Sequence, residues 1–247
     1  MLTWLTMRSM MKRATAAALT ISLAGATPAI ASAASTHAGD RIQITGDGAF
    51  GGNCTLNSIA KQGDTLYGVT SGHCFDESEL GFTATGVKDA SGDVLADVDD
   101  IAAGDNYYTN NGAVDDFAYF RLNDGVEVED YISSSPGVLP FINGFFQSPE
   151  VEVAGYKDVS DLRVGQIVTK DGAMSGRTMG MVLDVNSNSK EVTAIIPAIG
   201  GDSGGPLYVV ENGKAYIVGN LTGGSPLLFN IFDGTQQHIS SAGLEAF

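Results

Sequence analysis

The chain has 247 residues, of which 13 are Lys or Arg and 29 are Asp or Glu, so its formal net charge is −16. A hydrophobic content of 43% excludes a disordered chain. The acidic excess argues against nucleic acid or an anionic membrane surface as a partner, because both attract Lys and Arg. The 32 glycines show no collagen-like period and are typical of an all-β protein with many tight turns.

The first 34 residues are predicted to be a cleaved secretory signal peptide. Three basic residues are followed by the apolar run 14–26, and Ala29-Ile30-Ala31 and Ala31-Ser32-Ala33 then offer small-residue cleavage sites. The run is shorter than the roughly 20 apolar residues that a membrane span needs. We therefore predict a secreted protein without membrane association after cleavage. The mature chain, residues 35–247, would keep 10 basic and 29 acidic residues, a formal charge of −19.

Short β segments separated by turn residues follow from residue 46 onward. The segments most typical of strands are 65–70, 116–122, 164–169, 178–185 and 191–196. Asn212-Gly213 stands between two apolar runs and predicts a hairpin with a type I′ turn. The looser stretch 123–149 suggests a link between two β units, and residues 235–244 have a helical pattern.

The hexapeptide at residues 201–206, Gly-Asp-Ser-Gly-Gly-Pro, carries the strongest chemical signal. A serine between glycines on a tight turn leaves nearby backbone N–H groups free to converge. Such groups can bind a developing oxyanion. The alternative is an ordinary turn in a glycine-rich chain.

A serine nucleophile needs a base, and the mature chain has three histidines. His37 is expected in a mobile N-terminal tail, and His238 is expected at the surface in a polar stretch. His73 follows a strand-like run and is held beside Cys74, so it is the preferred base.

Cys54 is the one possible intramolecular partner of Cys74. Export favours a disulfide between them, which would fix the backbone next to His73. The alternative is two free thiols.

The base in turn needs a carboxylate to orient it and to stabilise the imidazolium. Asp115 and Asp116 both precede an apolar run, and the residues alone leave the choice between them open.

Three segments, Ser71 to Cys74, Asp116 to Ala118 and Gly201 to Pro206, resemble the signature segments of chymotrypsin-family serine proteases, in the same order. The similarity is closer to the bacterial streptogrisin and α-lytic branch, because Val168-Thr169-Lys170 and Thr222-Gly223-Gly224 also match segments of that branch. The resemblance implies an all-β fold of two six-stranded antiparallel β-barrels, with the active site in the cleft between them and a short C-terminal helix.

On this basis the protease domain would cover residues 35–247. Its N-terminal barrel is expected at about 44–125, the linker at about 126–149 and the C-terminal barrel at about 150–247.

The resemblance also implies the roles of the site residues. Ser203 matches the nucleophile, His73 the general base, and Asp116 the orienting carboxylate in preference to Asp115. The N–H groups of Gly201 and Ser203 would form the oxyanion hole. The strand that pairs with the substrate backbone would contain Thr222, Gly223 and Gly224.

Two departures from the family pattern lead to further expectations. Lys170 stands where the bacterial branch has an arginine, so we predict a Lys170–Asp202 ion pair in which a point charge replaces a bidentate donor. Pro197 is expected at the base of the primary pocket, where an acidic residue is absent, and Leu221 stands where glutamate-specific relatives have a histidine. An apolar P1 residue is therefore expected.

The sequence as a whole predicts a secreted serine endopeptidase acting on polypeptides, monomeric and without a metal or other cofactor. The alternatives are a protease-like fold kept as a binding or adhesion module, and a purely structural glycine-rich protein. The presence of all three matched catalytic residues favours the enzyme.

Overall fold

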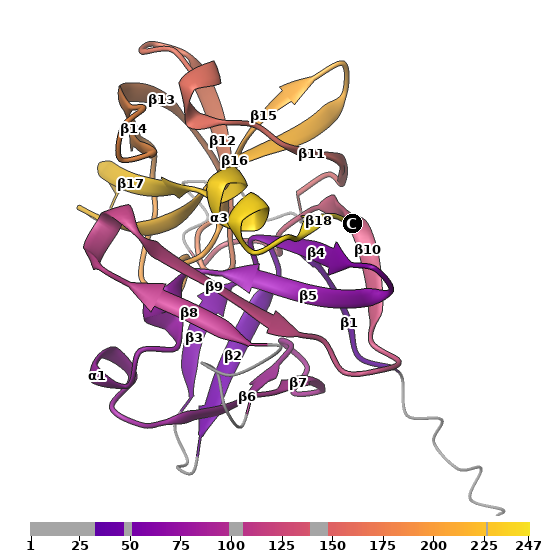
Figure 1. The fold of residues 1–247 in the computed structure, drawn as a ribbon. Helices are drawn as coiled ribbons and strands as arrows, with labels where there is room; N and C mark the ends of the chain where they lie inside the picture. The colour runs from indigo at the N-terminus through magenta and orange to yellow at the C-terminus, as the bar shows by residue number, and fades with distance from the viewer. Residues whose placement is uncertain (1–32, 47–50, 99–105, 139–147, 226) are drawn as a thin grey trace, which may run out of the picture. The chain divides into compact units, whose positions relative to one another are not determined.

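The structure, a computed structural model, describes residues 33–46, 51–98, 106–138, 148–225 and 227–247. Residues 33–247 form one compact unit, and the predicted signal peptide lies outside the described residues except for its last two positions. The described chain is mostly β-structure, with a short helix near its C-terminus (Figure 1).

The C-terminal half contains a closed barrel of six antiparallel strands. Each strand pairs with the next, and pairing between β16 and β17 closes the ring in the order β16-β15-β12-β13-β14-β17. The strands are β12 (Ile167–Gly172), β13 (Gly176–Asn186), β14 (Glu191–Ile195), β15 (Pro206–Glu211), β16 (Lys214–Gly224) and β17 (Phe229–Gly234). Every strand contributes a buried apolar side chain to one core, among them Val168, Val182, Val192, Leu207, Val218 and Phe232. The orange and yellow strands in the upper part of Figure 1 form this barrel.

The N-terminal half consists of two sheets that share one core. One sheet has the order β3-β2-β6-β7, from β2 (Arg41–Gly46), β3 (Gly52–Thr55), β6 (Ala84–Lys88) and β7 (Val94–Asp97). The other has the order β18-β4-β5-β9-β8, from β4 (Ser58–Gln62), β5 (Thr65–Thr70), β8 (Tyr107–Asn110), β9 (Asp116–Arg121) and β18 (Glu245–Ala246). Both sheets contribute to the buried cluster that includes Ile42, Leu95 and Phe120.

The described pairings therefore give one closed barrel, where the sequence analysis expected two. In the N-terminal half the chain leaves one sheet at Thr55 and enters the other at Ser58. Between them, the Leu56 N–H donates to Asp40 O and the Asn57 N–H donates to Val69 O. This change of partner separates β3 from β4. On the other side, the connection between β7 and β8 includes residues 99–105, which lie outside the described residues.

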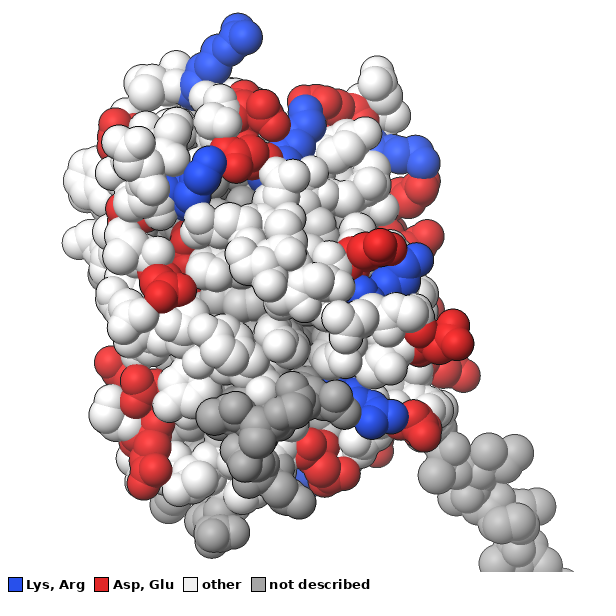
Figure 2. Space-filling view, viewed as in Figure 1, with Lys and Arg blue, Asp and Glu red and all other residues white. Residues whose placement is uncertain are grey.

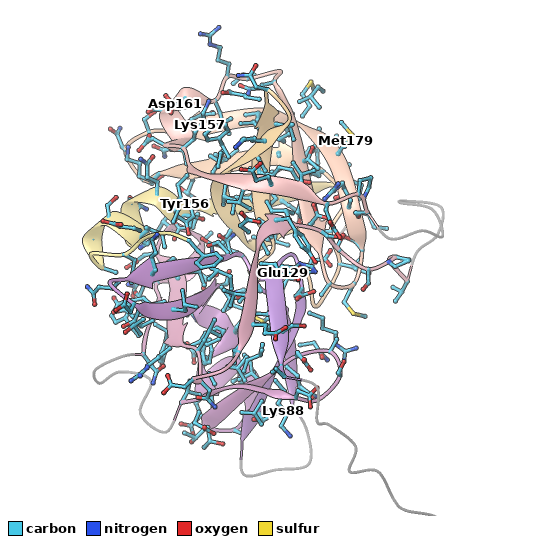
Figure 3. The ribbon with its side chains drawn as sticks, turned by 90° about the vertical axis from the view of Figure 1, so that its right-hand side faces the viewer. Lys88, Glu129, Tyr156, Lys157, Asp161 and Met179 are labelled. Carbon is cyan, nitrogen blue, oxygen red and sulfur yellow. A yellow bond between two sulfur atoms is a disulfide. The ribbon has the colours of Figure 1, made fainter. Side chains whose placement is uncertain are left out.

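The stretch expected to link the two halves contains regular structure. Within it, β10 (Glu127–Ile132) pairs in parallel with β1 (Ser35–Ala38) and antiparallel with β11 (Val151–Tyr156), which joins the barrel at β16. Tyr156, labelled in Figure 3, donates a hydrogen bond from its hydroxyl to Ser58 Oγ at 2.9 Å. Burial raises the pKa of Tyr156 to about 12. Residues 139–147 of the expected linker lie outside the described residues.

Several local expectations agree closely with the structure. The hairpin of β15 and β16 turns at Asn212 and Gly213, whose φ angles of 52° and 81° are those of a type I′ turn. The expected C-terminal helix is α3 (Thr235–Ser241). The expected strand 164–169 begins later, at Ile167, because residues 163–166 form a turn in which the Gln166 N–H donates to Arg163 O.

Candidate active site

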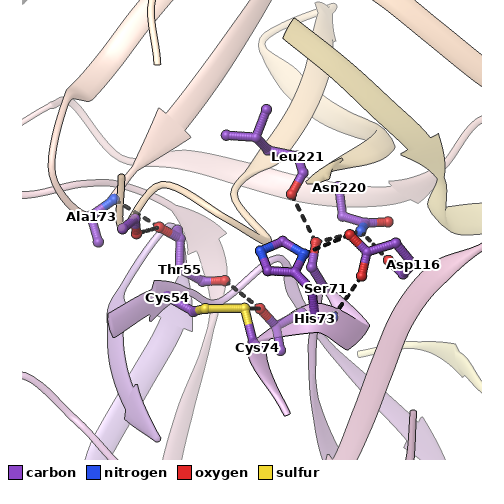
Figure 4. The surroundings of a disulfide bond; sticks show 11 residues. Cys54, Thr55, Ser71, His73, Cys74, Asp116, Ala173, Asn220 and Leu221 are labelled. Carbon is purple, nitrogen blue, oxygen red and sulfur yellow. Dashed lines mark hydrogen bonds and ion pairs between the residues drawn. A yellow bond between two sulfur atoms is a disulfide. The ribbon is translucent and has the colours of Figure 1, made fainter. Parts of the chain in front are cut away.

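His73 and Asp116 form a close pair at the edge of the N-terminal half (Figure 4). His73 lies in the 3-10 turn Gly72–Cys74 that follows β5, and Asp116 is the first residue of β9. His73 Nδ1 lies 2.6 Å from Asp116 Oδ2, and the His73 N–H donates to Asp116 Oδ1 at 2.7 Å. The Asp116 side chain is 2% exposed and that of His73 is 22% exposed. The buried carboxylate thus fixes both the backbone and the ring of a histidine that solvent still reaches.

Two residues that the sequence analysis did not single out hold Asp116 in place. Its N–H donates to Asp233 Oδ2 at 2.9 Å, and its carbonyl accepts from Asn220 Nδ2 at 2.8 Å. Asn220 Nδ2 also lies 2.8 Å from Ser71 Oγ. Both residues come from the barrel, so the orientation of Asp116 depends on the packing of the two halves.

A disulfide joins Cys54 of β3 to Cys74, as expected from the sequence. Both cysteines are buried, and Cys74 directly follows His73. The covalent link therefore ties the histidine turn to the end of β3. Figure 4 shows His73 and Asp116 beside this bond.

Thr55, next to Cys54, holds the turn that carries Ser203. The Thr55 N–H donates to Ser203 O at 2.8 Å, and its hydroxyl donates to Gly201 O at 3.0 Å. Ser203 is partly exposed, and its Oγ forms no hydrogen bond within the described residues. The histidine turn is thus linked to Cys54 through the disulfide, and the serine turn is hydrogen-bonded to Thr55, the next residue of β3.

Gly204 allows this close approach. A Cβ atom on Gly204 would lie 2.0 Å from Thr70 Oγ1 and 2.5 Å from Thr55 O, and its φ of +84° disfavours other residues. Asn57 strengthens the contact by donating to Gly204 O and Gly219 O, each at 3.2 Å. Glycine is therefore required directly after Ser203.

The N–H groups of Gly201 and Ser203 make no hydrogen bond with any other part of the chain that the structure describes. Their neighbours are bonded, because the Asp202 N–H donates to Ile199 O and the Gly204 N–H donates to Leu221 O. Since the carbonyls of both residues are fixed by Thr55, the turn leaves two positioned donors without an acceptor.

Lys170 and Asp202 form a fully buried ion pair, with Nζ 3.1 Å from Oδ2. Lys170 also donates to Ser175 Oγ at 2.8 Å, and Asp202 accepts from the N–H groups of Met174, Ser175 and Ile199. Burial opposes ionisation of Asp202, but the charge of Lys170 and these hydrogen bonds outweigh it and lower the pKa of the carboxyl. The pair anchors the turn that ends at Ser203.

Thr222, Gly223 and Gly224 lie at the end of β16. On one side Gly223 and Gly224 pair with β17, whereas the pairing of β16 with β15 stops at Asn220. Among the described residues, a Cβ on Gly223 would meet no atom within 4 Å. This part of β16 therefore has an open edge among the described residues, which an extended peptide can pair with.

Pro197 lies after β14, and its carbonyl accepts from Thr178 Oγ1 at 2.9 Å. The Asn230 side chain donates to the neighbouring Ile196 O at 2.6 Å. The three residues 196–198 are uncharged, and Asn230 is a polar neighbour that the sequence analysis missed.

The expectations for the other two histidines were wrong. His37 lies in β1 with 13% of its side chain exposed, and its ring contacts Asp40. His238 lies in α3 with 14% exposed, and its Nε2 lies 2.8 Å from Asp233 Oδ2. Both partners are close in sequence, three residues from His37 and five from His238, but each contact depends on the local turn, which for His238 is the one between β17 and α3.

Across the described ranges no group of three or more metal-ligating side chains is close enough to hold a metal ion. No helix there has the length and apolar character needed to cross a membrane.

No family model matches the chain, and no curated protein matches its sequence. Solved structures match it over most of its length. Protease A of Thermobifida fusca is 19% identical with a TM-score of 0.59, over 86% of this chain and 98% of that one. A glutamic acid specific serine protease that uses a histidine triad in substrate binding is 21% identical with a TM-score of 0.59, over 86% and 100%. A protease of Nocardiopsis is 17% identical with a TM-score of 0.58, over 87% and 100%.

The chain has the chymotrypsin-like fold. The sequence resemblance to bacterial proteases of this fold thus agrees with the structural matches.

Proposed function

We propose that this protein is a secreted serine endopeptidase, with Ser203 as nucleophile, His73 as general base and Asp116 as the orienting carboxylate. The observation that carries the proposal is the buried Asp116 carboxylate, 2.6 Å from His73 Nδ1 and also bonded to the His73 N–H. This contact leaves His73 Nε2 without a partner among the described residues, available to a hydroxyl group. The serine turn is held against the same segment through Thr55.

The reaction follows from these positions. Ser203 Oγ attacks the carbonyl carbon of the scissile bond while His73 takes its proton, and the oxygen that becomes negative accepts from the N–H groups of Gly201 and Ser203. His73 then gives the proton to the leaving amine as the carbon–nitrogen bond breaks. Water, activated by the same histidine, hydrolyses the acyl-enzyme and restores Ser203.

The substrate would lie between the two halves of the molecule, with its backbone paired to Thr222, Gly223 and Gly224. An apolar P1 side chain is favoured because residues 196–198 carry no charge and Asn230 supplies only an amide. A glutamate preference lacks support, since Leu221 occupies the place where a histidine is expected for it. We further propose a monomer that needs no cofactor.

Cleavage of a peptide library by the purified protein tests this proposal. The wild type should cleave within peptides after apolar residues, whereas Ser203→Ala and His73→Ala should each lower kcat by several orders of magnitude, as loss of a triad member does. Ser91→Ala, at an exposed turn, is the matched control and should retain full activity. A folded wild-type protein that cleaves no peptide would instead favour a binding module.

A further inference from the structure

A second histidine–aspartate pair lies directly behind Asp116. His238 Nε2 is 2.8 Å from Asp233 Oδ2, and the same oxygen accepts the Asp116 N–H at 2.9 Å. Asp233 is fully buried, so its oxygen has a fixed place between the helix α3 and the first residue of β9. One carboxylate oxygen thus connects His238 to the backbone of the residue that orients His73.

The His238 ring is also held by packing. It stacks on Phe117, with ring centroids 4.6 Å apart and an angle of 11° between the planes. Phe117 follows Asp116 in β9, so ring stacking and hydrogen bonding hold two consecutive residues of the same strand. Without the hydrogen bond from His238, the buried Asp233 carboxylate would lose one of the donors that stabilise it in the interior, and removing a partner from a buried carboxylate costs a large free energy of unfolding.

The surroundings of His238 are acidic and aromatic. Its Nδ1 lies 4.0 Å from Asp115 Oδ1, and Gln237 Nε2 donates to the other oxygen of Asp233 at 3.3 Å. Its remaining face borders a pocket that is also lined by Tyr107 and Tyr119. The Asp233 carboxylate is therefore bonded by the His238 ring, the Gln237 amide and the Asp116 N–H.

We infer that His238 and Asp233 are a positioning pair for the proposed catalytic site: His238 holds Asp233, and Asp233 holds the backbone of Asp116 so that its carboxylate meets His73. This inference rests on the proposed function. Neither residue touches the reacting atoms; both act through Asp116. A displacement of about 1 Å in such a site can cost about 100-fold in rate, so the expected effect is on kcat.

His238→Phe is the main test variant, because it keeps a ring to stack on Phe117 and removes the donor to Asp233. It should lower kcat for a peptide amide by about 10-fold or more, with KM changed less than about twofold. His238→Gln supplies a donor to Asp233 again and should restore most of kcat. The inference would be overturned if the activity of His238→Phe fell only in proportion to its unfolded fraction. It would also be overturned if His238→Gln were no more active than His238→Phe.

His37→Phe is the matched control. His37 is equally buried, contacts an aspartate and packs on Tyr131 with ring centroids 4.5 Å apart. It lies in β1 and has no contact with Asp116. This variant should keep the wild-type kcat, which separates the positioning effect from the general loss of a histidine–aspartate pair.

Proton NMR of His73 separates failure of this inference from failure of the proposed function. The proton on Nδ1, in the 2.6 Å contact with Asp116, is expected far downfield in the wild type, in His37→Phe and in His238→Gln. In His238→Phe it should move upfield or broaden through exchange with water. An unchanged resonance and an unchanged kcat in His238→Phe would refute the positioning role. A downfield resonance that depends on His238 in a protein without peptidase activity would refute the proposed function alone.

Discussion

Asp116 has every polar atom of its backbone and carboxylate engaged in the structure. Its two carboxylate oxygens bond to His73, its N–H to Asp233 and its carbonyl to Asn220. The sequence predicted the pairing with His73 through the resemblance to a known family. It did not predict Asp233 or Asn220, because each of these contacts spans more than 100 residues and neither lies in a recognised motif.

The Lys170–Asp202 pair provides a test at the level of single residues. Lys170→Met leaves a buried carboxylate unpaired, which typically costs about 3–5 kcal/mol in the free energy of unfolding. We expect this loss in urea denaturation, together with lower peptidase activity because Asp202 anchors the serine turn.

Lys190→Met is the matched control, since Lys190 pairs with Asp158 where both side chains are about 30% exposed. Exposed pairs contribute about 0–1 kcal/mol, so this variant should be nearly as stable as the wild type. Equal stability of the two variants would contradict the structural role of the buried pair.

The lowered pKa of Asp202 predicts a loss of stability in acid. A carboxyl whose pKa falls on folding stabilises the protein at pH values above its ordinary pKa of 3.8. This contribution disappears as the pH falls through the lower pKa of the folded state. The free energy of unfolding should therefore decline below about pH 4. Asp202→Asn should show a shallower decline in urea titrations between pH 5 and about pH 2; an identical slope would argue against ionisation of Asp202 in the folded state.

The strands of the barrel were the elements best predicted from sequence. Segments 178–185 and 191–196 correspond to β13 and β14, because alternating side chains and turn residues encode such strands locally. The partners of β1, β10 and β11 were missed, since their parallel pairings join distant segments and leave no short-range pattern. The division of the N-terminal half into two sheets was also missed, because it depends on the change of backbone partner at Leu56 and Asn57, which bond to Asp40 O and Val69 O.

The type I′ turn at Asn212 and Gly213 can be tested as an element. Gly213→Val places a branched residue at a φ of +81°, which costs about 1–2 kcal/mol in the left-handed region. The urea midpoint should fall accordingly, with peptidase activity unchanged at low urea. Asn212→Gly, in which glycine tolerates the positive φ at that position, is the control and should change the free energy of unfolding by less than about 1 kcal/mol. Equal effects of the two changes would contradict the assigned turn.

The molecule as a whole is strongly acidic. The mature chain predicted from the sequence has a formal charge of −19. On the face shown in Figure 2, acidic side chains lie along both sides and the middle carries few charges. Such a field attracts cationic substrates over distances set by ionic strength, without altering the chemistry at His73.

This charge predicts a salt-dependent preference among substrates. A peptide flanked by lysines should have a higher kcat/KM than the same peptide flanked by glutamates at about 0.01 M salt, where the Debye length is about 30 Å. The ratio should approach one near 1 M salt, where the length is about 3 Å. A ratio that does not change with salt would assign the preference to direct contacts rather than to the overall charge.

Labelling by a fluorophosphonate, followed by mass spectrometry of the modified peptide, tests the central claim most directly. A serine activated by His73 and an oxyanion-binding turn reacts with such a reagent, whereas an ordinary serine does not. We predict one label per molecule, on Ser203, absent in Ser203→Ala and greatly slowed in His73→Ala. Folded protein with its disulfide intact that takes no label on Ser203 would contradict the account.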